Sequence, residues 1–332
     1  MPPFCRRTIL TAFGPALVAS DACFLGSGAL AQSYPSRPVK IVVPFPAGGS
    51  NDIIARVIAQ KLSERNNGQT VFVENRGGAG GNIGAEAVAS ADPDGYTLLL
   101  TAPPPLTNNA ALYKDLRFDP STAFVPIALI ASVPIVLAVN PSTGIKNVEG
   151  LIALAKAKPG TLFFGSSGNG STNHLAGELL KSMTGIDIVH VPYKGAAPAM
   201  NDLVAGHIPM MFDNIPAVLP QVRGTNINAI AVAGTKRASA LPDVPTVAES
   251  GVPGFEASAW FGLVAPAKTP APVLAKLGDD VEAILKMPDV VKRFDELGAE
   301  PGTVSGPAFG KFLADETAKW TKIIRESGAK VD

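Results

Sequence analysis

The sequence predicts an α/β protein in which mostly parallel strands alternate with helices. Short runs of β-branched and other apolar residues alternate with segments in which apolar residues recur at helical spacing, and glycine-rich turns separate the two. The 332 residues are 46% hydrophobic and 17% charged, which excludes a disordered chain. This length suffices for a large core and is typical of about two domains.

The first part of the chain shows the alternation most clearly. Short apolar runs that begin with a β-branched or aromatic residue predict strands at 39–43, 71–73 and 96–101. Helical spacing of apolar residues from Ile53 to Leu62, and the segment 82–90, predict the helices between them. Strands joined by helices favour parallel pairing, with helices on the faces of the sheet.

A second set of alternating elements begins near Asn140. We expect strands at 161–165, 187–191, 208–213 and 228–233, and helices at 148–157, 172–183 and 196–205. Another strand, 260–265, precedes helices around 271–287, 289–297 and 307–327. The apolar face of the last helix is expected to pack into the core. It consists of Phe309, Phe312, Leu313, Trp320, Ile323 and Ile324.

Residues 1–31 have the features of a cleaved export signal. Arg6 and Arg7 precede a moderately apolar stretch, and Ala29-Leu30-Ala31 fits the small-x-small pattern before a cleaved bond. The paired arginines are typical of a twin-arginine signal, and a general-secretory signal fits as well. Cys5 and Cys23 lie within this segment, so the mature chain has no thiol for a disulfide, a metal site or a nucleophile.

Charge argues against nucleic acid as a partner. The chain has 28 Lys plus Arg and 28 Asp plus Glu, and no basic stripe stands out. The histidines His174, His190 and His207 have no metal-ligand spacing, and we expect packing or surface roles for them. We expect no catalytic residue, no metal and no cofactor.

Two glycine-rich loops, residues 45–52 and 166–173, each follow a strand and open a helix. A helix N-terminus presents unpaired N–H groups and a partial positive charge, and glycine lets a ligand approach the backbone closely. Neither loop contains Lys or Arg, so a carboxylate suits them better than a polyphosphate. Ordinary turns with Ser, Asn and Asp as helix caps are the alternative for either loop alone. Two such loops in successive units favour a ligand cleft.

Other local signals leave alternatives open. The third glycine-rich run, residues 77–84, suggests a dinucleotide site, but Ile83 stands where the third glycine of that motif would fall. Asp52 in a first helical turn is explained by the helix dipole. Asp213 ends an apolar strand, where it either pairs with a cationic part of a ligand or holds a neighbouring N–H group.

Many ordered segments resemble one family, the substrate-binding proteins of tripartite tricarboxylate transporters, also called Bug-type extracytoplasmic solute receptors. The resemblance extends from about Tyr34 to Asp332. Its segments share the residue types and the order of the family's motifs. They are 34–38 (Tyr-Pro-Ser-Arg-Pro), 44–49 with Asp52, 73–76, 80–84, 93–96, 166–170, 190–195, 212–214 and 241–246.

The resemblance implies a two-lobed, type II periplasmic-binding-protein fold with the ligand cleft between the lobes. Residues 34–137 plus 258–332 would form lobe one and 138–257 lobe two, with crossings near 136–140 and 256–260. The chain departs from the family at Pro103-Pro104-Pro105, which replaces a Ser/Thr/Gly-rich stretch that can border the pocket.

The resemblance also implies the ligand-binding residues, which lie in the two loops and at the end of one strand. They are Phe45, Ala47, Gly48, Gly49, Asp52, Ser166, Ser167, Gly168, Asn169, Ser171, Thr172 and Asp213.

These inferences predict a monomeric periplasmic receptor that captures a small organic anion and passes it to membrane permease subunits. Dicarboxylates, aromatic acids and acidic amino acids are the ligand classes that the resemblance implies. An exported dinucleotide-dependent oxidoreductase and a receptor that signals to a membrane sensor are the alternatives.

Overall fold

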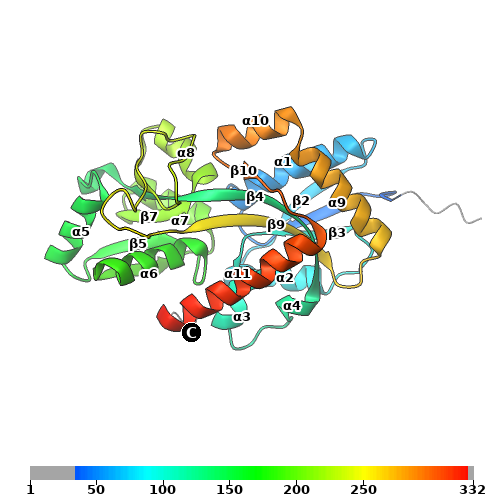
Figure 1. Cartoon of the computed structure of the whole chain (residues 1–332), viewed down its shortest axis with the longest axis horizontal. Helices are drawn as coiled ribbons and strands as arrows, with labels where there is room; N and C mark the ends of the chain where they lie inside the picture. Colours follow the sequence, from blue (N-terminus) through cyan, green and yellow to red (C-terminus); the bar gives the residue numbers. More distant parts are fainter. Residues whose placement is uncertain (1–33, 328–332) are drawn as a thin grey trace, which may run out of the picture. The chain divides into compact units, whose positions relative to one another are not determined.

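Two long strands connect the two halves of the described chain. The computed structural model describes residues 34–327, in which β4 (Phe124–Val139) and β9 (Ser258–Pro266) lie side by side (Figure 1). Residues 124–134 of β4 pair antiparallel with β9, whereas residues 135–139 pair with strands of the second half. The sheet is therefore continuous, with the order β2-β1-β3-β9-β4-β7-β5-β6, while β8 and β10 also pair with β4.

The first half contains the parallel strands β1 (Val39–Val43), β2 (Val71–Asn75) and β3 (Thr97–Thr101), and β3 pairs antiparallel with β9. Longer helices accompany these strands and begin or end at glycine or proline in several cases. They are α1 (Ser50–Arg65), α2 (Asn82–Ala89), α9 (Ala271–Leu285), α10 (Pro288–Leu297) and α11 (Gly306–Ser327).

The second half repeats the pattern with β5 parallel to both β6 and β7. Its strands are β5 (Leu162–Ser166), β6 (Ile188–Pro192), β7 (Met210–Asn214) and β8 (Asn228–Val232). Its helices are α5 (Val148–Ala157), α6 (Thr172–Thr184), α7 (Ala196–Ala205) and α8 (Ile215–Arg223).

Short elements fill the connections. They are η1 (Ala79–Gly81), η2 (Pro104–Asn108), α3 (Asn109–Leu112), α4 (Pro120–Ala123), η3 (Pro141–Thr143) and β10 (Glu300–Pro301).

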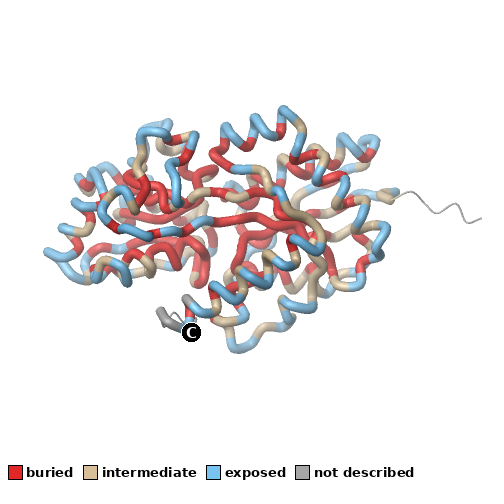
Figure 2. Tube along the Cα trace, viewed as in Figure 1, coloured by how far each residue is buried: buried red, intermediate tan, exposed pale blue. Residues whose placement is uncertain are grey.

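The core follows the strands. Figure 2 shows buried residues concentrated along the strands and exposed residues on the outer sides of the helices. The connecting strand β4 has no exposed residue from Ile135 to Val139. On α11, Phe309, Trp320 and Ile324 are buried, which confirms core packing for these three residues. The side chain of Ile323 lies outside the described residues.

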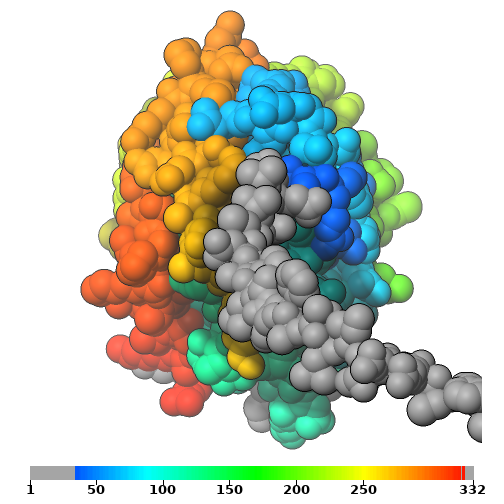
Figure 3. All heavy atoms as spheres, turned by 90° about the vertical axis from the view of Figure 1, so that its right-hand side faces the viewer, coloured from blue at the N-terminus to red at the C-terminus, as the bar shows by residue number. Residues whose placement is uncertain are grey.

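Helices on the outside of the first half are held together by ion pairs. The surface of α1 adjoins that of α9 and α10 on one face (Figure 3). Arg65 Nε lies 3.2 Å from Asp280 Oδ1, and Lys61 Nζ lies 2.7 Å from Asp289 Oδ2. These contacts hold the C-terminal part of α1 against α9 and α10. They therefore help to position the helix and its N-terminus.

The α/β fold with helices around the sheet is confirmed, and each strand predicted from the sequence is present. The long strand β4 was not predicted because Pro126 and Pro134 interrupt its pattern. Proline cannot donate to the ladder, and β4 accommodates Pro126 at a register shift against β9. Helix α8 was also missed, since Pro220 lies inside it and proline normally ends a helix.

The proposed signal, residues 1–31, lies outside the described residues, as do Cys5 and Cys23. Among residues 34–327, no helix has both the length and the apolar character needed to cross a membrane.

Candidate functional site

The two glycine-rich loops meet at a small cavity between the halves. Phe45 and Gly49 come from the first loop, and Ser167, Ser171 and Thr172 come from the second. The cavity has a volume of about 30 Å³. The other lining residues are mostly small or polar, and none is Lys or Arg. They are Pro46, Ser50, Asn51, Ala102, Pro104, Asn173, Ala196, Asn214 and Ala259.

Four helices begin at this cavity. The lining includes the first residues of α1, α6 and α7 and the residue that precedes α8. The first N–H groups of a helix have no acceptor within the helix, and they carry the positive end of its dipole. Convergence of four such ends creates a positive potential without any cationic side chain. This arrangement is suited to a small anion.

The start of α1 leaves its polar groups available. Gly49 is the N-cap and provides no side-chain hydrogen bond to the first turn. Ser50 Oγ and Asn51 Oδ1 are buried and have no hydrogen-bond partner within residues 34–327. These side chains are 2% and 8% exposed, so they are removed from bulk water as well. A buried polar group without a partner costs free energy, and a polar ligand in the cavity would remove that cost.

The start of α6 is more ordered. Ser171 is its N-cap, and the Ser171 hydroxyl accepts a hydrogen bond from the His174 N–H group at 3.2 Å. Thr172 and Asn173 follow in the first turn and both line the cavity. Asn173 Nδ2 donates to Asp213 Oδ1 at 2.9 Å, which fixes the orientation of the amide.

Asp213 lies behind the cavity wall instead of in it. Its side chain is fully buried at the end of β7, where Oδ1 also accepts the Asn214 N–H group at 2.8 Å. Burial raises the pKa of Asp213 to about 7, and the hydrogen bonds from Asn214 and Asn173 oppose this shift only in part. Asp213 therefore holds a neighbouring N–H group, which is one of the two roles left open by the sequence, while Asp213 Oδ2 is buried and has no hydrogen-bond partner within residues 34–327.

The starts of α7 and α8 complete the cavity. Gly195 precedes α7 and approaches Pro46 of the first loop so closely that a Cβ atom on Gly195 would lie 2.4 Å from Pro46 Cδ. Asn214 precedes α8 without capping it, and Asn214 Oδ1 is another buried atom with no partner within residues 34–327. The two halves are therefore in contact around the cavity.

Asp52 stabilises the first loop from outside the cavity. Asp52 Oδ2 accepts hydrogen bonds from the Gly48 N–H group and from Arg56 Nε, both at 3.0 Å. Burial raises the pKa of Asp52, but the hydrogen bonds from Arg56 and Gly48 outweigh burial and lower it overall. The Gly48 amide is thus already bound. The helix-dipole explanation of Asp52 is incomplete, because this carboxylate also orders the loop.

A pair of stacked histidines supports the second loop. The rings of His174 and His190 lie 3.8 Å apart, His190 Nε2 lies 2.6 Å from Ser166 Oγ, and His174 Nδ1 accepts the Gly170 N–H group at 3.1 Å. Burial lowers the pKa of His174 to about 4 and, together with His174, that of His190 to about 3. Both rings are neutral at pH 7 and act as packing residues, as expected.

Of the twelve residues proposed from the sequence, five line the cavity and seven do not. Ala47 and Gly48 face solvent, and Asp52 and Asp213 bind neighbouring groups. Ser166 and Gly168 hydrogen-bond to each other within the second loop, and Asn169 lies in that loop outside the cavity. Asn51, Asn173 and Asn214 also line the cavity but were not among the proposed residues. Asn51 and Asn173 lie within the two predicted loops, which was the available signal, whereas Asn214 precedes α8, a helix that was not predicted.

The third glycine-rich run serves packing. A Cβ atom on Gly84 would lie 2.7 Å from both Arg76 O and Pro44 Cβ, so glycine lets α2 lie against the strand ends. Residues 34–327 contain no group of three or more His, Cys, Asp or Glu side chains arranged to hold a metal ion.

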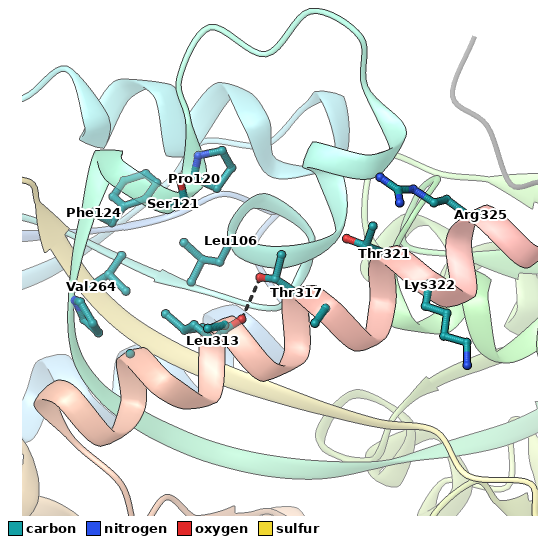
Figure 4. A pocket seen from close by; sticks show the side chains of 14 residues that line it. Leu106, Pro120, Ser121, Phe124, Val264, Leu313, Thr317, Thr321, Lys322 and Arg325 are labelled. Atoms are coloured by element: carbon teal, nitrogen blue, oxygen red, sulfur yellow. Dashed lines mark hydrogen bonds between the residues drawn. The ribbon is translucent and has the colours of Figure 1, made fainter.

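A larger hollow of about 780 Å³ lies elsewhere, along α11 and next to α4. Figure 4 shows Leu106, Phe124, Val264 and Leu313 in its wall, with Arg325 toward the end of α11. This hollow contains neither glycine-rich loop and is mainly apolar. The small cavity is therefore the better candidate for an anion site.

Comparison with known proteins shows the family of this chain. The tripartite tricarboxylate transporter family receptor, TctC, matches residues 54–329. Protein BugT of Bordetella pertussis is 40% identical over 302 residues, which cover 91% of this chain and 92% of BugT. A protein encoded in the TAR-I ttuE-ttuC' intergenic region of Agrobacterium vitis is 42% identical over 300 residues, covering 90% of this chain and 86% of that protein.

Solved structures show the same fold. An R. palustris protein solved with adipate is 40% identical, with a TM-score of 0.87 over 90% of this chain and 100% of that one. MatC from Rhodopseudomonas palustris with bound malate is 33% identical, with a TM-score of 0.82 over 88% and 100%. The fold is the two-lobed α/β fold of periplasmic binding proteins, and these relatives are solute-binding receptors, not enzymes. The chain belongs to the receptor family of the tripartite tricarboxylate transporters.

Proposed function

We propose that this protein is a periplasmic receptor that binds a small carboxylate in the cavity between its halves. The observation that carries the proposal is the convergence of four helix N-termini on a cavity that the unpartnered Ser50 hydroxyl also lines. Backbone N–H groups and the Ser50 hydroxyl can donate hydrogen bonds to carboxylate oxygens, and the helix dipoles stabilise the negative charge. The relatives solved with adipate and malate support this ligand class.

Binding would be coupled to closure of two lobes. Residues 34–137 plus 258–332 would form lobe one, and residues 138–257 would form lobe two. The change of partners within β4, and the contact between Pro46 and Gly195, support a hinge on the connecting strands and a cleft opposite to it. A ligand that contacts both loops stabilises the closed form by its differential affinity for that form.

The closed, loaded protein would act as a monomer and deliver its ligand to the membrane permease subunits of the transporter. Family membership supports this partnership. Export would depend on residues 1–31 as a cleaved signal, by the twin-arginine or the general-secretory route.

The substitution Gly49→Ala tests the site with little effect on folding. Gly49 has an ordinary φ of −79°, and a Cβ atom there would lie 3.8 Å from Ala196 Cβ and 3.7 Å from Pro46 O, which are normal contact distances. The added methyl group would occupy the space between the starts of α1 and α7. We expect the dissociation constant for the tightest ligand in a calorimetric carboxylate panel to rise at least about tenfold, with an unchanged melting temperature.

Gly278→Ala is the matched control, because Gly278 lies in α9 and a Cβ atom there would have no neighbour within 4 Å. It should leave the affinity unchanged. If no mono-, di- or aromatic carboxylate binds, or if Gly49→Ala binds as tightly as the unchanged protein, the proposed site is wrong.

A further inference from the structure

We propose that the ligand is an amphiphilic monocarboxylate, with its charged group at the four helix starts and an apolar end against the segment after β3. This inference rests on the proposed function and narrows its ligand class. It depends on a difference between the walls of the cavity. One wall carries hydrogen-bond donors, and the other carries none that is free.

The segment after β3 opens with η2, and its first turn has no available N–H group. Three successive residues, Pro103 to Pro105, lack the group altogether. The next two N–H groups, of Leu106 and Thr107, both donate to Pro103 O, at 3.0 and 2.9 Å. In contrast to the starts of α1, α6, α7 and α8, this turn therefore offers no backbone donor to an anion.

The polar side chains of the same segment are also bound elsewhere. Thr107 Oγ1 lies 2.9 Å from Pro103 O and 2.8 Å from Asn108 Oδ1. Asn108 Nδ2 donates to Gly170 O at 2.9 Å, and Asn109 Nδ2 lies 2.6 Å from Asn82 Oδ1. Thr101 Oγ1 donates to Ala102 O at 3.1 Å. None of these four side chains lines the cavity.

Apolar groups take the place of donors on this wall. Ala102 and Pro104 line the cavity from the segment itself, Phe45 lies in the loop after the adjacent strand β1, and Ala259 lies on the connecting strand β9. All four residues are buried, with Phe45 6% and Ala259 2% exposed. A methyl or methylene group gains free energy on burial against such a wall, whereas a second carboxylate would lose its water without gaining hydrogen bonds.

Matched acid pairs test this difference directly. Hexanoate and adipate share a six-carbon chain, and butyrate and succinate share a four-carbon chain; each pair differs only in a methyl or a carboxylate at the distal end. With the full mature protein in calorimetry at pH 7, we expect the monocarboxylate of at least one pair to bind at least about tenfold more tightly than its dicarboxylate.

The substitution Pro104→Ser places a hydroxyl and an N–H group on the apolar wall. It should lower the ratio of monocarboxylate to dicarboxylate affinity at least about fivefold. Pro120→Ser is the matched control, because Pro120 occupies the same first position of a short helix, α4, outside the cavity. Ala259→Ser adds a hydroxyl to the same wall from β9 and should also lower the ratio of monocarboxylate to dicarboxylate affinity. This variant replaces Pro104→Ser in the test if Pro104→Ser fails to fold.

The outcomes separate this inference from the proposed function. Binding of both members of a pair, with the dicarboxylate equal or tighter, would refute the monocarboxylate preference and leave the carboxylate receptor intact. An unchanged ratio in both folded wall variants would show that this wall does not contact the distal end. Failure of every carboxylate to bind would refute the function, and the inference with it.

Discussion

Asp213 shows how a single buried group links the site to stability. Its carboxyl holds the Asn173 amide and the Asn214 N–H group, which belong to two residues that line the cavity. In the folded chain its pKa is about 7, against an ordinary value of 3.8. Between these pH values the folded state keeps a proton that the unfolded state has lost. The contribution of Asp213 to the free energy of unfolding is thus complete below about pH 4 and lost as the pH rises through 7.

Asp213→Asn should therefore change the pH dependence of stability. The amide Oδ1 can accept the same two hydrogen bonds and does not titrate. Relative to the unchanged protein, the variant should gain stability between pH 4 and 8 by up to about 4 kcal/mol. Urea unfolding at several pH values measures the difference. His174 and His190 titrate in both proteins, so their contributions cancel. A constant difference across this range would show that Asp213 has no raised pKa.

Helix starts are the elements that define the site, and their caps can be tested in pairs. Ser171 caps α6 at the cavity, whereas Asn147 caps α5 at a surface position and accepts the Gly150 N–H group at 2.8 Å. Both caps satisfy one of the first N–H groups of a helix. Only Ser171 also contacts the cavity.

Ser171→Ala and Asn147→Ala should each lower the free energy of unfolding by about 1 kcal/mol. Ser171→Ala should in addition weaken carboxylate binding, because the first turn of α6 loses its fixed geometry next to the ligand. Chemical denaturation and calorimetry on the same samples separate the two effects. Equal binding by the two variants would indicate that the start of α6 does not contact the ligand.

At the scale of the whole molecule, an apolar cluster joins the halves beside the cavity. Leu112 of α3 and Trp320 and Ile324 of α11 pack with Leu175 of α6, and all four are buried. The sequence assigned α11 to one lobe and α6 to the other. If the proposed lobes open and close, this contact would stabilise the closed arrangement and set the fraction of molecules that are ready to bind.

Leu175→Ala should shift the ligand-free protein toward the open form. We expect a larger radius of gyration by small-angle X-ray scattering and a raised dissociation constant for the ligand. Leu277→Ala removes a similarly buried side chain from the core of the first half, at a cost of about 2–5 kcal/mol in stability, without touching the contact between the halves. If both variants have the same radius and the same affinity, the cluster does not control closure.

The alternation of strands and helices and the two glycine-rich loops could be predicted from the sequence alone, and the loops favoured an anionic ligand. These features are local: periodicity defines each element, and a loop that opens a helix without Lys or Arg offers N–H groups wherever it lies. Five of the twelve proposed residues line the cavity for this reason.

Which polar groups are free, and what faces them, depends on the tertiary structure. Gly48 has the right local signal, but its N–H group donates to Asp52, while the Ser50 hydroxyl has no partner within residues 34–327. The apolar wall joins residues that follow β1 and β3 to Ala259 of β9, which is more than 150 residues further along the chain. Contacts between segments so far apart in the sequence depend on the order of the strands in the sheet. A local sequence pattern does not contain that order.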